Sequence, residues 1–454
     1  MAEKQCACSH YPTVILPGIG QSRADLVDEA GNKIGTSFPM QLDKKALIRP
    51  VVFPALLMMI TRMDLGFTKA VAKGVRGALD TLVSLPNGQR KHRVRVVEYP
   101  NSFAQCNEEE RKFIMRMIPV PSLADSIGED HLFYFSYDIF GEIQSTVRHL
   151  NDFIQNVKRV TGHDKVNLMP VSMGGTVLTA YMADYGAADD VHRVVAAVPA
   201  YNGSIIASDL LLGNIDADDY ENLFIYLAGN RDGKKMAEYV RFVPKRIIKK
   251  LIHTLLEAGL GAVLTNSTTM WGLATAEAYA ALRDKLLSDD AHQGIRKILD
   301  HYYETRRDLP AMVKQAQARG VEFFTLCGYD IPIFQAINTK DINSDGIIPT
   351  VSAGMGVQAA PRGQTLGADC KQQNLYCSDP SHNHISPDNV IDASTGPLPD
   401  TTWYFKGMGH EEAADDCHLL KIACRLLADD SLKSVFDLPE YPQFLDYEPI
   451  EKKK

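Results

Sequence analysis

Buried strands and amphipathic helices alternate through the central part of this chain, and that order restricts the fold more than any other feature. The strand segments are short and strongly apolar, while a helical segment repeats its apolar side chains every three or four residues. The alternating segments are 132–137, 142–160, 165–169, 175–185 and 191–198. Because each helix returns the chain to the same edge of the sheet, successive strands run parallel. The pattern predicts an α/β fold with a mostly parallel sheet and crossover helices.

The rest of the chain divides into further sheet segments and three long insertions. Strand patterns recur at 13–16, 93–97, 321–326 and 402–405, and a helix is expected at 415–427. A chain of 454 residues exceeds the roughly 250 to 300 residues that one hydrophobic core supports. The excess falls in a mostly helical insertion at about 36–90, a helical stretch at 204–320 and a long loop at 353–399. We expect one core from 11–203 and 321–430, with 204–320 as a helical cap or lid.

Composition and charge exclude several classes of protein. The chain has 48 Lys and Arg against 56 Asp and Glu, a net charge of -8. It therefore lacks the overall excess of positive charge that binding to nucleic acid phosphates favours. The longest apolar run, 50–61, is shorter than the ~20 residues that span a bilayer, so we expect no transmembrane helix. The first ten residues lack the basic start and apolar run of a secretory signal. We therefore expect a cytoplasmic protein.

The segment Met169-Pro170-Val171-Ser172-Met173-Gly174-Gly175 places a serine between a buried strand and a helix rich in small residues. A tight turn at this point exposes the hydroxyl above the sheet, and the two glycines let strand and helix approach closely. This arrangement resembles the nucleophile elbow of the α/β-hydrolases. It departs from the usual G-x-S-x-G because Pro170 stands two residues before the serine. We predict Ser172 as a nucleophile.

A serine nucleophile needs a base and an acid that orients the base, and in this fold they follow in the order serine, acid, histidine. His410 follows the last strand and precedes the closing helix, with Gly407 and Gly409 beside it, so it is the predicted base. Two aspartates compete for the acid. Asp330 follows the strand 321–326 directly, whereas Asp345 lies further along the chain, and spacing alone leaves both open.

Four segments together resemble one branch of the α/β-hydrolases. They are Leu16-Pro17-Gly18-Ile19-Gly20, Tyr137-Asp138, Pro170-Val171-Ser172-Met173-Gly174-Gly175 and Ser344-Asp345-Gly346-Ile347-Ile348-Pro349. This set is similar to the lecithin:cholesterol acyltransferase-like branch, whose members include acyltransferases and phospholipases that cleave ester bonds of lipids. In that branch the acid lies in an Asp-Gly-Thr-Val-Pro-like segment, so the resemblance implies Asp345 rather than Asp330. The fold also implies an oxyanion hole built from the backbone N–H groups of Ile19 and Met173.

The sequence offers little support for a cofactor or a metal. Cys370, Cys377, His382 and His384 lie close together, but C-x6-C followed by H-x-H is not a usual spacing for structural zinc. The glycines near Ser172 lack the G-x-G-x-x-G order of dinucleotide sites. We therefore expect no cofactor and no metal.

The predicted activity is serine-dependent hydrolysis of carboxylic esters, in the manner of a lipase or phospholipase, through an acyl-enzyme on Ser172. An O-acyltransferase that passes the acyl group to an alcohol is the alternative, and a non-catalytic binding protein on the same scaffold is the third hypothesis. A helix near 244–256 with a basic face and an apolar face allows peripheral contact of the cap with a membrane. The apolar stretch 51–60 is interpreted either as buried packing or as a lid that faces lipid.

Overall fold

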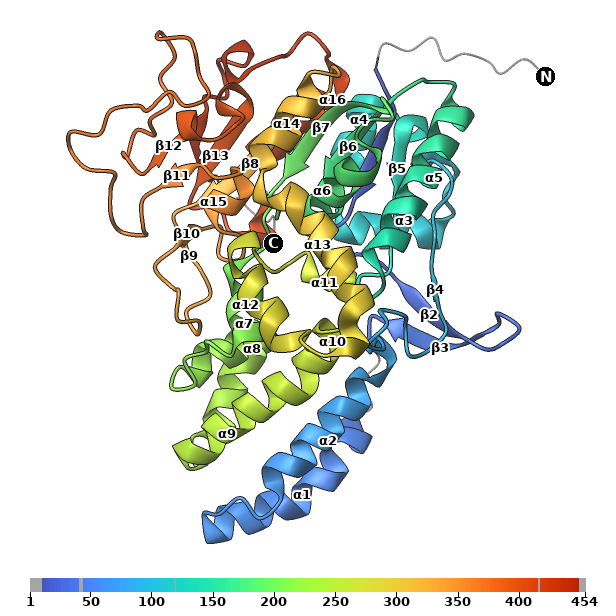
Figure 1. Ribbon diagram of the computed structural model, residues 1–454, viewed down its shortest axis with the longest axis vertical. Coiled ribbons are helices and arrows are strands. Elements are labelled where there is room, and N and C mark those ends of the chain that lie inside the picture. The colour runs from blue at the N-terminus through green and yellow to red at the C-terminus, as the bar shows by residue number, and fades with distance from the viewer. Residues whose placement is uncertain (1–9, 41–43, 119, 415–416, 449–454) are drawn as a thin grey trace.

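A computed structural model describes residues 10–40, 44–118, 120–414 and 417–448 of the protein, and it is organised around one parallel sheet (Figure 1). Seven strands follow the order β14-β13-β8-β7-β6-β1-β5, and every neighbouring pair is parallel. Their bounds are β1 Thr13–Leu16, β5 Leu132–Tyr134, β6 Val166–Pro170, β7 Val191–Ala197, β8 Glu322–Tyr329, β13 Thr402–Lys406 and β14 Phe444–Asp446. The predicted α/β class with a parallel sheet is confirmed.

The sheet is buried on both faces because its strands are apolar at successive positions. Side chains of one strand alternate between two separate cores: Val194 and Ala196 of β7 enter one, while Val195 and Ala197 enter the other. Four helices cover the first face, namely α5 Ile143–Thr161, α6 Gly174–Tyr185, α13 Gln293–Arg307 and α14 Leu309–Gln317. The second face packs against α3 Glu108–Met117, α4 Val120–Ile127 and α16 Cys417–Ala428.

The segment expected as a strand at 93–97 lies outside the main sheet. It forms β4 Val94–Val96, which pairs antiparallel with β2 Ala24–Val27, and β2 also pairs with β3 Lys33–Phe38. The apolar residues of 93–97 alternate with the two-residue period that all strands share. That period does not determine which sheet a strand joins. Two short antiparallel pairs complete the strands, β9 Ile331–Pro332 with β10 Asn343–Ser344, and β11 Gln358–Ala359 with β12 Ile391–Asp392.

The segment between β7 and β8, which the sequence predicted as a helical cap, consists of helices. Its helices are α7 Ile205–Leu212, α8 Tyr220–Val240, α9 Lys245–Leu255, α10 Ala262–Leu264, α11 Thr268–Trp271 and α12 Ala276–Leu286. The last two helices of the 204–320 segment, α13 and α14, instead pack against the core through side chains such as Tyr302 and Met312. They act as the crossover that returns the chain to β8.

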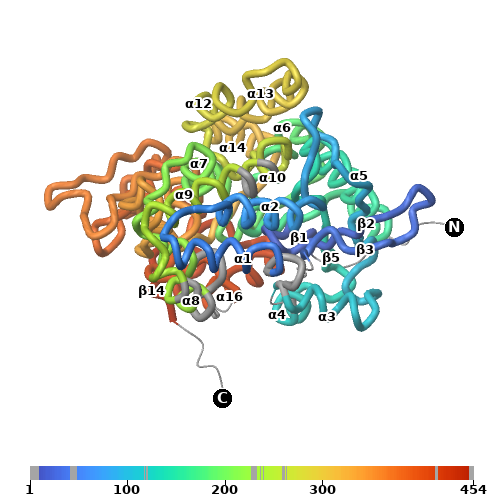
Figure 2. Tube along the Cα trace, turned by 90° about the horizontal axis from the view of Figure 1, so that it is seen from below, coloured from blue at the N-terminus to red at the C-terminus, as the bar shows by residue number. Residues whose placement is uncertain are grey.

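The insertion at 36–90 and the cap form one helical body, although they are far apart in the sequence. Helices α1 Lys44–Thr61 and α2 Phe67–Leu79 lie beside α9 at the end of the molecule away from the sheet (Figures 1 and 2). Met58, Phe67, Ile247 and Leu251 make a shared apolar cluster among the three helices. Lys250 of α9 also pairs with Asp64 beside α2, at 2.5 Å between Nζ and Oδ2.

Within the described residues, none of the helices combines the length and the apolar character that crossing a bilayer requires.

The stretch 353–399, expected as a long loop, contains short strands and packs against the main sheet. It begins within α15 Thr350–Ala353 and contains β11 and β12. Val357, Ala360 and Ile391 of this stretch pack with Tyr329 of β8 and Tyr404 of β13 in a common apolar cluster. These hydrophobic contacts hold both ends of the excursion against the sheet, and the residues between them extend outward.

Helix α6 approaches strand β1 so closely that only glycine fits at the contact. A Cβ on Gly174 would lie 2.1 Å from the carbonyl oxygen of Leu16. We expect Gly174→Ala to lower the free energy of unfolding by more than about 3 kcal/mol, because backbone atoms must move to relieve the overlap. Urea denaturation measures the change. Gly77→Ala is the matched control: it lies in α2, where an added Cβ meets no atom within 4 Å, so stability should be unchanged or slightly higher. Equal stability of the two variants would contradict the prediction.

Candidate active site

Ser172 occupies a strained turn between β6 and α6. Its φ is +52°, in the left-handed region that residues other than glycine rarely adopt. The surrounding backbone holds it there: the Ser172 N–H donates to the carbonyl of Ala197 in β7, with N and O 3.1 Å apart. The Ser172 carbonyl accepts from the N–H groups of Gly175 and Ala200, each at 2.9 Å. Strain of this kind persists only where several contacts enforce it, and such positions cluster at functional sites.

Glycines surround the turn on two sides. Besides Gly174 against β1, a Cβ on Gly18 would lie 2.9 Å from the Cβ of Ser172, and one on Gly175 would lie 3.0 Å from the backbone nitrogen of Ala200. Because these glycines have no side chains, the loop after β1, the turn at Ser172 and the segment after β7 can come together. The small residues in the sequence pattern are therefore required by contact distances.

Pro170 stands where the usual G-x-S-x-G motif has its first glycine. It lies at a point of β6 where the strand pairing with β7 does not require its N–H. The pairing of β6 with β7 includes Leu168 with Val194 and then an isolated bridge between Val171 and Ala197. Pro170 falls between these two points, and on its other side it pairs with Leu16 of β1. Because proline cannot donate to a ladder, a gap in the pairing is a place it can occupy.

The structure brings Ser172, His410 and Asp345 together from three separate segments. Ser172 Oγ lies 2.8 Å from Nε2 of His410, and Nδ1 of His410 lies 2.7 Å from Oδ2 of Asp345. The His410 N–H also donates to the Asp345 carbonyl at 2.8 Å. The predicted nucleophile, base and orienting acid are thus linked in the order that acyl transfer requires.

The Asp345 carboxylate is buried and held by its own loop. Its Oδ1 accepts hydrogen bonds from the N–H groups of Ile347 and Ile348, at 3.0 and 2.7 Å. Those two bonds leave Oδ2 directed at His410. The loop therefore determines both the position of the carboxylate and which of its oxygens meets the imidazole.

Asp330, the other aspartate considered, takes a different position. It follows β8 at a φ of +66°, and its N–H donates to the side-chain oxygen of Asn343 at 2.7 Å. Within the described residues, no hydrogen bond or ion pair links Asp330 to His410. The structure thus places Asp345, and not Asp330, beside the imidazole.

The environment of His410 has two opposing effects on its pKa. Burial disfavours the charged imidazolium and lowers the pKa, whereas the Asp345 carboxylate favours it through charge and a hydrogen bond. Burial is the largest single effect, but the charge and hydrogen bond of Asp345 together with the charge of Glu411 outweigh it, so the pKa of His410 is raised above its ordinary value of 6.5. The Asp345 carboxylate therefore favours the protonated form of His410, the form that a general base takes after accepting a proton.

The two backbone groups expected to bind an oxyanion belong to segments that meet at Ser172: Met173 follows the serine, and Gly18 of the Ile19 loop approaches its Cβ. Met173 starts helix α6, and Ile19 lies in the loop after β1 with its side chain 49% exposed. Among the described residues, neither of their N–H groups donates a hydrogen bond. The Gly18 N–H is by contrast occupied by Oε1 of Gln21, at 2.6 Å. Free backbone donors, one of them at a helix start, are suited to a developing negative charge.

Tyr137 and Gln21, which were not predicted as site residues, hold the loop after β1 in place. The buried Tyr137 hydroxyl donates to the carbonyl of Pro17 at 2.8 Å. Gln21 binds the Gly18 N–H, as described above. The Tyr137-Asp138 pair was noticed in the sequence only through family resemblance, and nothing local in the sequence indicates that Gln21 turns back onto its own loop.

A family model described as the α/β hydrolase fold matches residues 118–329, which include β5 to β8 and the Ser172 turn. The chain has the α/β-hydrolase fold. Among solved structures, a lipase-esterase related protein from Clostridium acetobutylicum is similar at 13% identity, over 45% of this chain and 77% of that chain, with a TM-score of 0.20. No curated protein matches the chain.

The contact between Asp345 and His410 makes a testable distinction between the two aspartates. Asp345→Asn should slow labelling of Ser172 by a fluorophosphonate probe about 10⁴-fold, because an amide no longer holds the productive tautomer of His410. Asp330→Asn is the control, since asparagine tolerates the left-handed backbone at that position, and its rate should match the wild type within a few fold. Labelling rates followed by mass spectrometry measure both. The reverse result would assign the acid to Asp330.

The raised pKa of His410 predicts how the labelling rate depends on pH. Only the neutral imidazole accepts the serine proton, so the rate should fall as pH decreases through the pKa of His410. Half of the rate should be lost at a pH above 6.5, the ordinary pKa of histidine. In Asp345→Asn the residual rate should show its midpoint at lower pH, because the charge that raises the pKa is gone. A wild-type midpoint at or below 6.5 would contradict the electrostatic account.

Proposed function

We propose that this protein is a serine-dependent carboxylic ester hydrolase in which Ser172 is the nucleophile, His410 the general base and Asp345 the orienting acid. One observation carries the proposal: Ser172 Oγ lies 2.8 Å from an imidazole whose other nitrogen is paired with a buried carboxylate. The α/β-hydrolase fold supports it, because in that fold the nucleophile stands on the turn that Ser172 occupies.

The proposed reaction proceeds in two halves. His410 Nε2 removes the Ser172 proton as Oγ attacks the ester carbonyl, and the N–H groups of Ile19 and Met173 stabilise the oxyanion. His410 then gives its proton to the departing alcohol, which leaves an acyl-enzyme. Water, activated by the same imidazole, releases the acid and restores Ser172. Each oxyanion donor is worth roughly 3 kcal/mol in such sites.

We infer a lipid ester as the substrate class, as in the lecithin:cholesterol acyltransferase-like branch that the sequence resembles. The outer surface of α1 supports this inference, because it carries large apolar side chains that the protein does not cover. Phe53 and Ile60 are 68% and 77% exposed, and Val52, Leu56 and Met59 are each about half exposed. Figure 2 shows α1 on the outside of the helical body that it forms with α2 and α9.

The same surface is the proposed point of peripheral membrane contact. Exposed apolar side chains on one helix favour insertion into the interface of a bilayer rather than solution. The basic face of α9 contributes less than its sequence suggested, since Lys249 and Lys250 are already paired with Asp218 and Asp64. Membrane contact in this proposal therefore depends mainly on the apolar side chains of α1.

A panel of esters compared with Ser172→Ala tests the proposed function. Wild-type protein should release acid from a short-chain soluble ester and, more efficiently, from phospholipid in vesicles, whereas Ser172→Ala should lose about 10⁶-fold in kcat. A folded wild-type protein that fails both to turn over the panel and to react with a fluorophosphonate would favour a non-catalytic binding protein.

The same assay separates hydrolysis from acyl transfer. With an acceptor alcohol present, product analysis should still find mainly free acid, because water is the proposed acceptor of the acyl group. A predominance of transferred acyl product would identify an O-acyltransferase that uses the same acyl-enzyme.

A further inference from the structure

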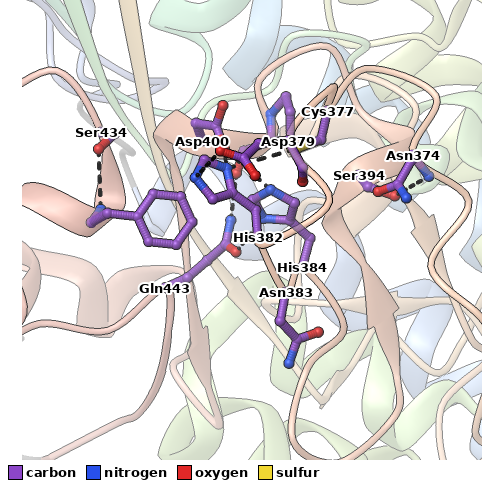
Figure 3. A network of polar contacts seen from close by, with 12 residues as sticks. Asn374, Cys377, Asp379, His382, Asn383, His384, Ser394, Asp400, Ser434 and Gln443 are labelled. Atoms are coloured by element: carbon purple, nitrogen blue, oxygen red, sulfur yellow. Dashed lines mark hydrogen bonds and ion pairs between the residues drawn. The ribbon is translucent and has the colours of Figure 1, made fainter.

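Four potential metal ligands converge at the base of the long excursion between β11 and β12. They are Cys377, His382 and His384 of the excursion, and Asp400, which lies just before β13. One ligand atom from each residue lies within 4.8 Å of all the others. Figure 3 shows both imidazoles and the Asp400 carboxylate directed toward one another.

We propose that these four side chains bind a structural Zn²⁺ ion. The ligand atoms would be Cys377 Sγ, His382 Nδ1, His384 Nε2 and a carboxylate oxygen of Asp400. One thiolate, two imidazoles and one carboxylate form a donor set that zinc accepts in tetrahedral sites. Binding displaces the proton of the Cys377 thiol, so one proton leaves as the sulfur–metal bond forms.

The distances between ligand atoms are close to those around a tetrahedral zinc ion. Zinc bonds of about 2.0 Å to nitrogen or oxygen and 2.3 Å to sulfur imply ligand separations of roughly 3.3 Å and 3.5 Å. Asp400 Oδ1 lies 2.9 Å from His382 Nδ1 and 3.2 Å from His384 Nε2. Cys377 Sγ lies 3.7 Å from His382 Nδ1. Small side-chain movements would therefore complete the coordination.

Hydrogen bonds outside the cluster determine which nitrogen of His384 is available. Gln443 Nε2 donates to the carbonyls of Pro399 and Thr402, so its Oε1 can only accept. That oxygen lies 2.8 Å from His384 Nδ1, which must therefore carry the proton. In the neutral ring this leaves the lone pair on Nε2, directed into the cluster. His384 is fully buried, and its Nε2 makes no hydrogen bond of acceptable geometry within the described residues.

His382 has a comparable outer contact. Its Nε2 lies 3.5 Å from Oδ2 of Asp379, while its Nδ1 faces Asp400 and Cys377. The ring of Phe436 covers His382, with centroids 4.0 Å apart. Metal-bound imidazoles usually have such a partner on the second nitrogen, because it orients the ring.

A cluster of hydrogen bonds without metal explains fewer of these contacts. Asp400 Oδ1 alone would have to serve both imidazoles, and the buried Nε2 of His384 would have no well-aligned partner, although the Cys377 thiol has the Asp379 carbonyl oxygen at 3.6 Å. The Asp400 side chain remains 40% exposed, which leaves a route by which an ion can enter.

The site would act on structure rather than on the reaction. Four protein ligands leave no open position for substrate or water. The ion would join the excursion to the segment that starts β13, the strand that leads to His410. The spacing of cysteines and histidines in the sequence did not indicate this site, because the residue that joins Cys377, His382 and His384 is Asp400 and not Cys370.

Metal analysis of the full-length protein tests the proposal independently of ester hydrolysis. After removal of metal with a chelator, titration with Zn²⁺ alone should give one tight site per chain and raise Tm by roughly 5 °C or more. Co²⁺ in its place should show the visible bands of tetrahedral coordination and a thiolate charge-transfer band.

Two variants and a matched control complete the test. Cys377→Ser and His382→Ala should each weaken Zn²⁺ binding at least about 100-fold, whereas Cys370→Ser should bind as tightly as the wild type. Absence of a stoichiometric Zn²⁺ site in the wild-type protein, or equal affinity in Cys377→Ser and Cys370→Ser, would overturn the proposal. A Co²⁺ spectrum without the thiolate band would do so even if a variant failed to fold.

Discussion

The contact between Gly174 and the carbonyl oxygen of Leu16 is the constraint on which the arrangement at Ser172 depends. It lets the start of α6 reach the carboxyl end of β1, so the serine turn stands directly beside the loop that carries Ile19. The price of this geometry is an unfavourable backbone conformation at Ser172, which hydrogen bonds to β7 and to Ala200 maintain. One missing side chain thereby brings the proposed nucleophile next to the loop that carries Ile19.

The parallel sheet explains why distant segments meet there. Loops that leave the carboxyl ends of parallel strands gather at one edge, and the turn after β6 and the loop after β13 both do so. Asp345 joins them from the β10 segment, where two backbone N–H groups of its own loop hold its carboxylate. The buried Asp345 and His410 pair is favourable because each polar atom at the contact has a partner.

Outside the sheet, the insertions are organised by contacts between segments that are far apart in the chain. Helices α1 and α2 bury Met58 and Phe67 against α9, and this packing leaves the other face of α1 apolar and exposed. The 353–399 stretch packs both ends on β8 and β13, which brings its histidines to Asp400. The two proposals for these regions, a lipid-facing helix and a zinc ion, thus depend on long-range packing.

The sequence by itself determined the features that depend on local order. Alternating strands and helices predicted the parallel sheet, the glycines after Ser172 predicted a tight turn, and His410 was found from its place after the last strand. Spacing left two aspartates open and only the family resemblance implied Asp345, whose carboxylate the tertiary structure places against His410. Only the tertiary structure decided which sheet β4 joins, and that Asp400 rather than Cys370 lies with Cys377. A local period of two or 3.6 residues reports which face of an element is buried, but it carries no information about partners distant in the chain.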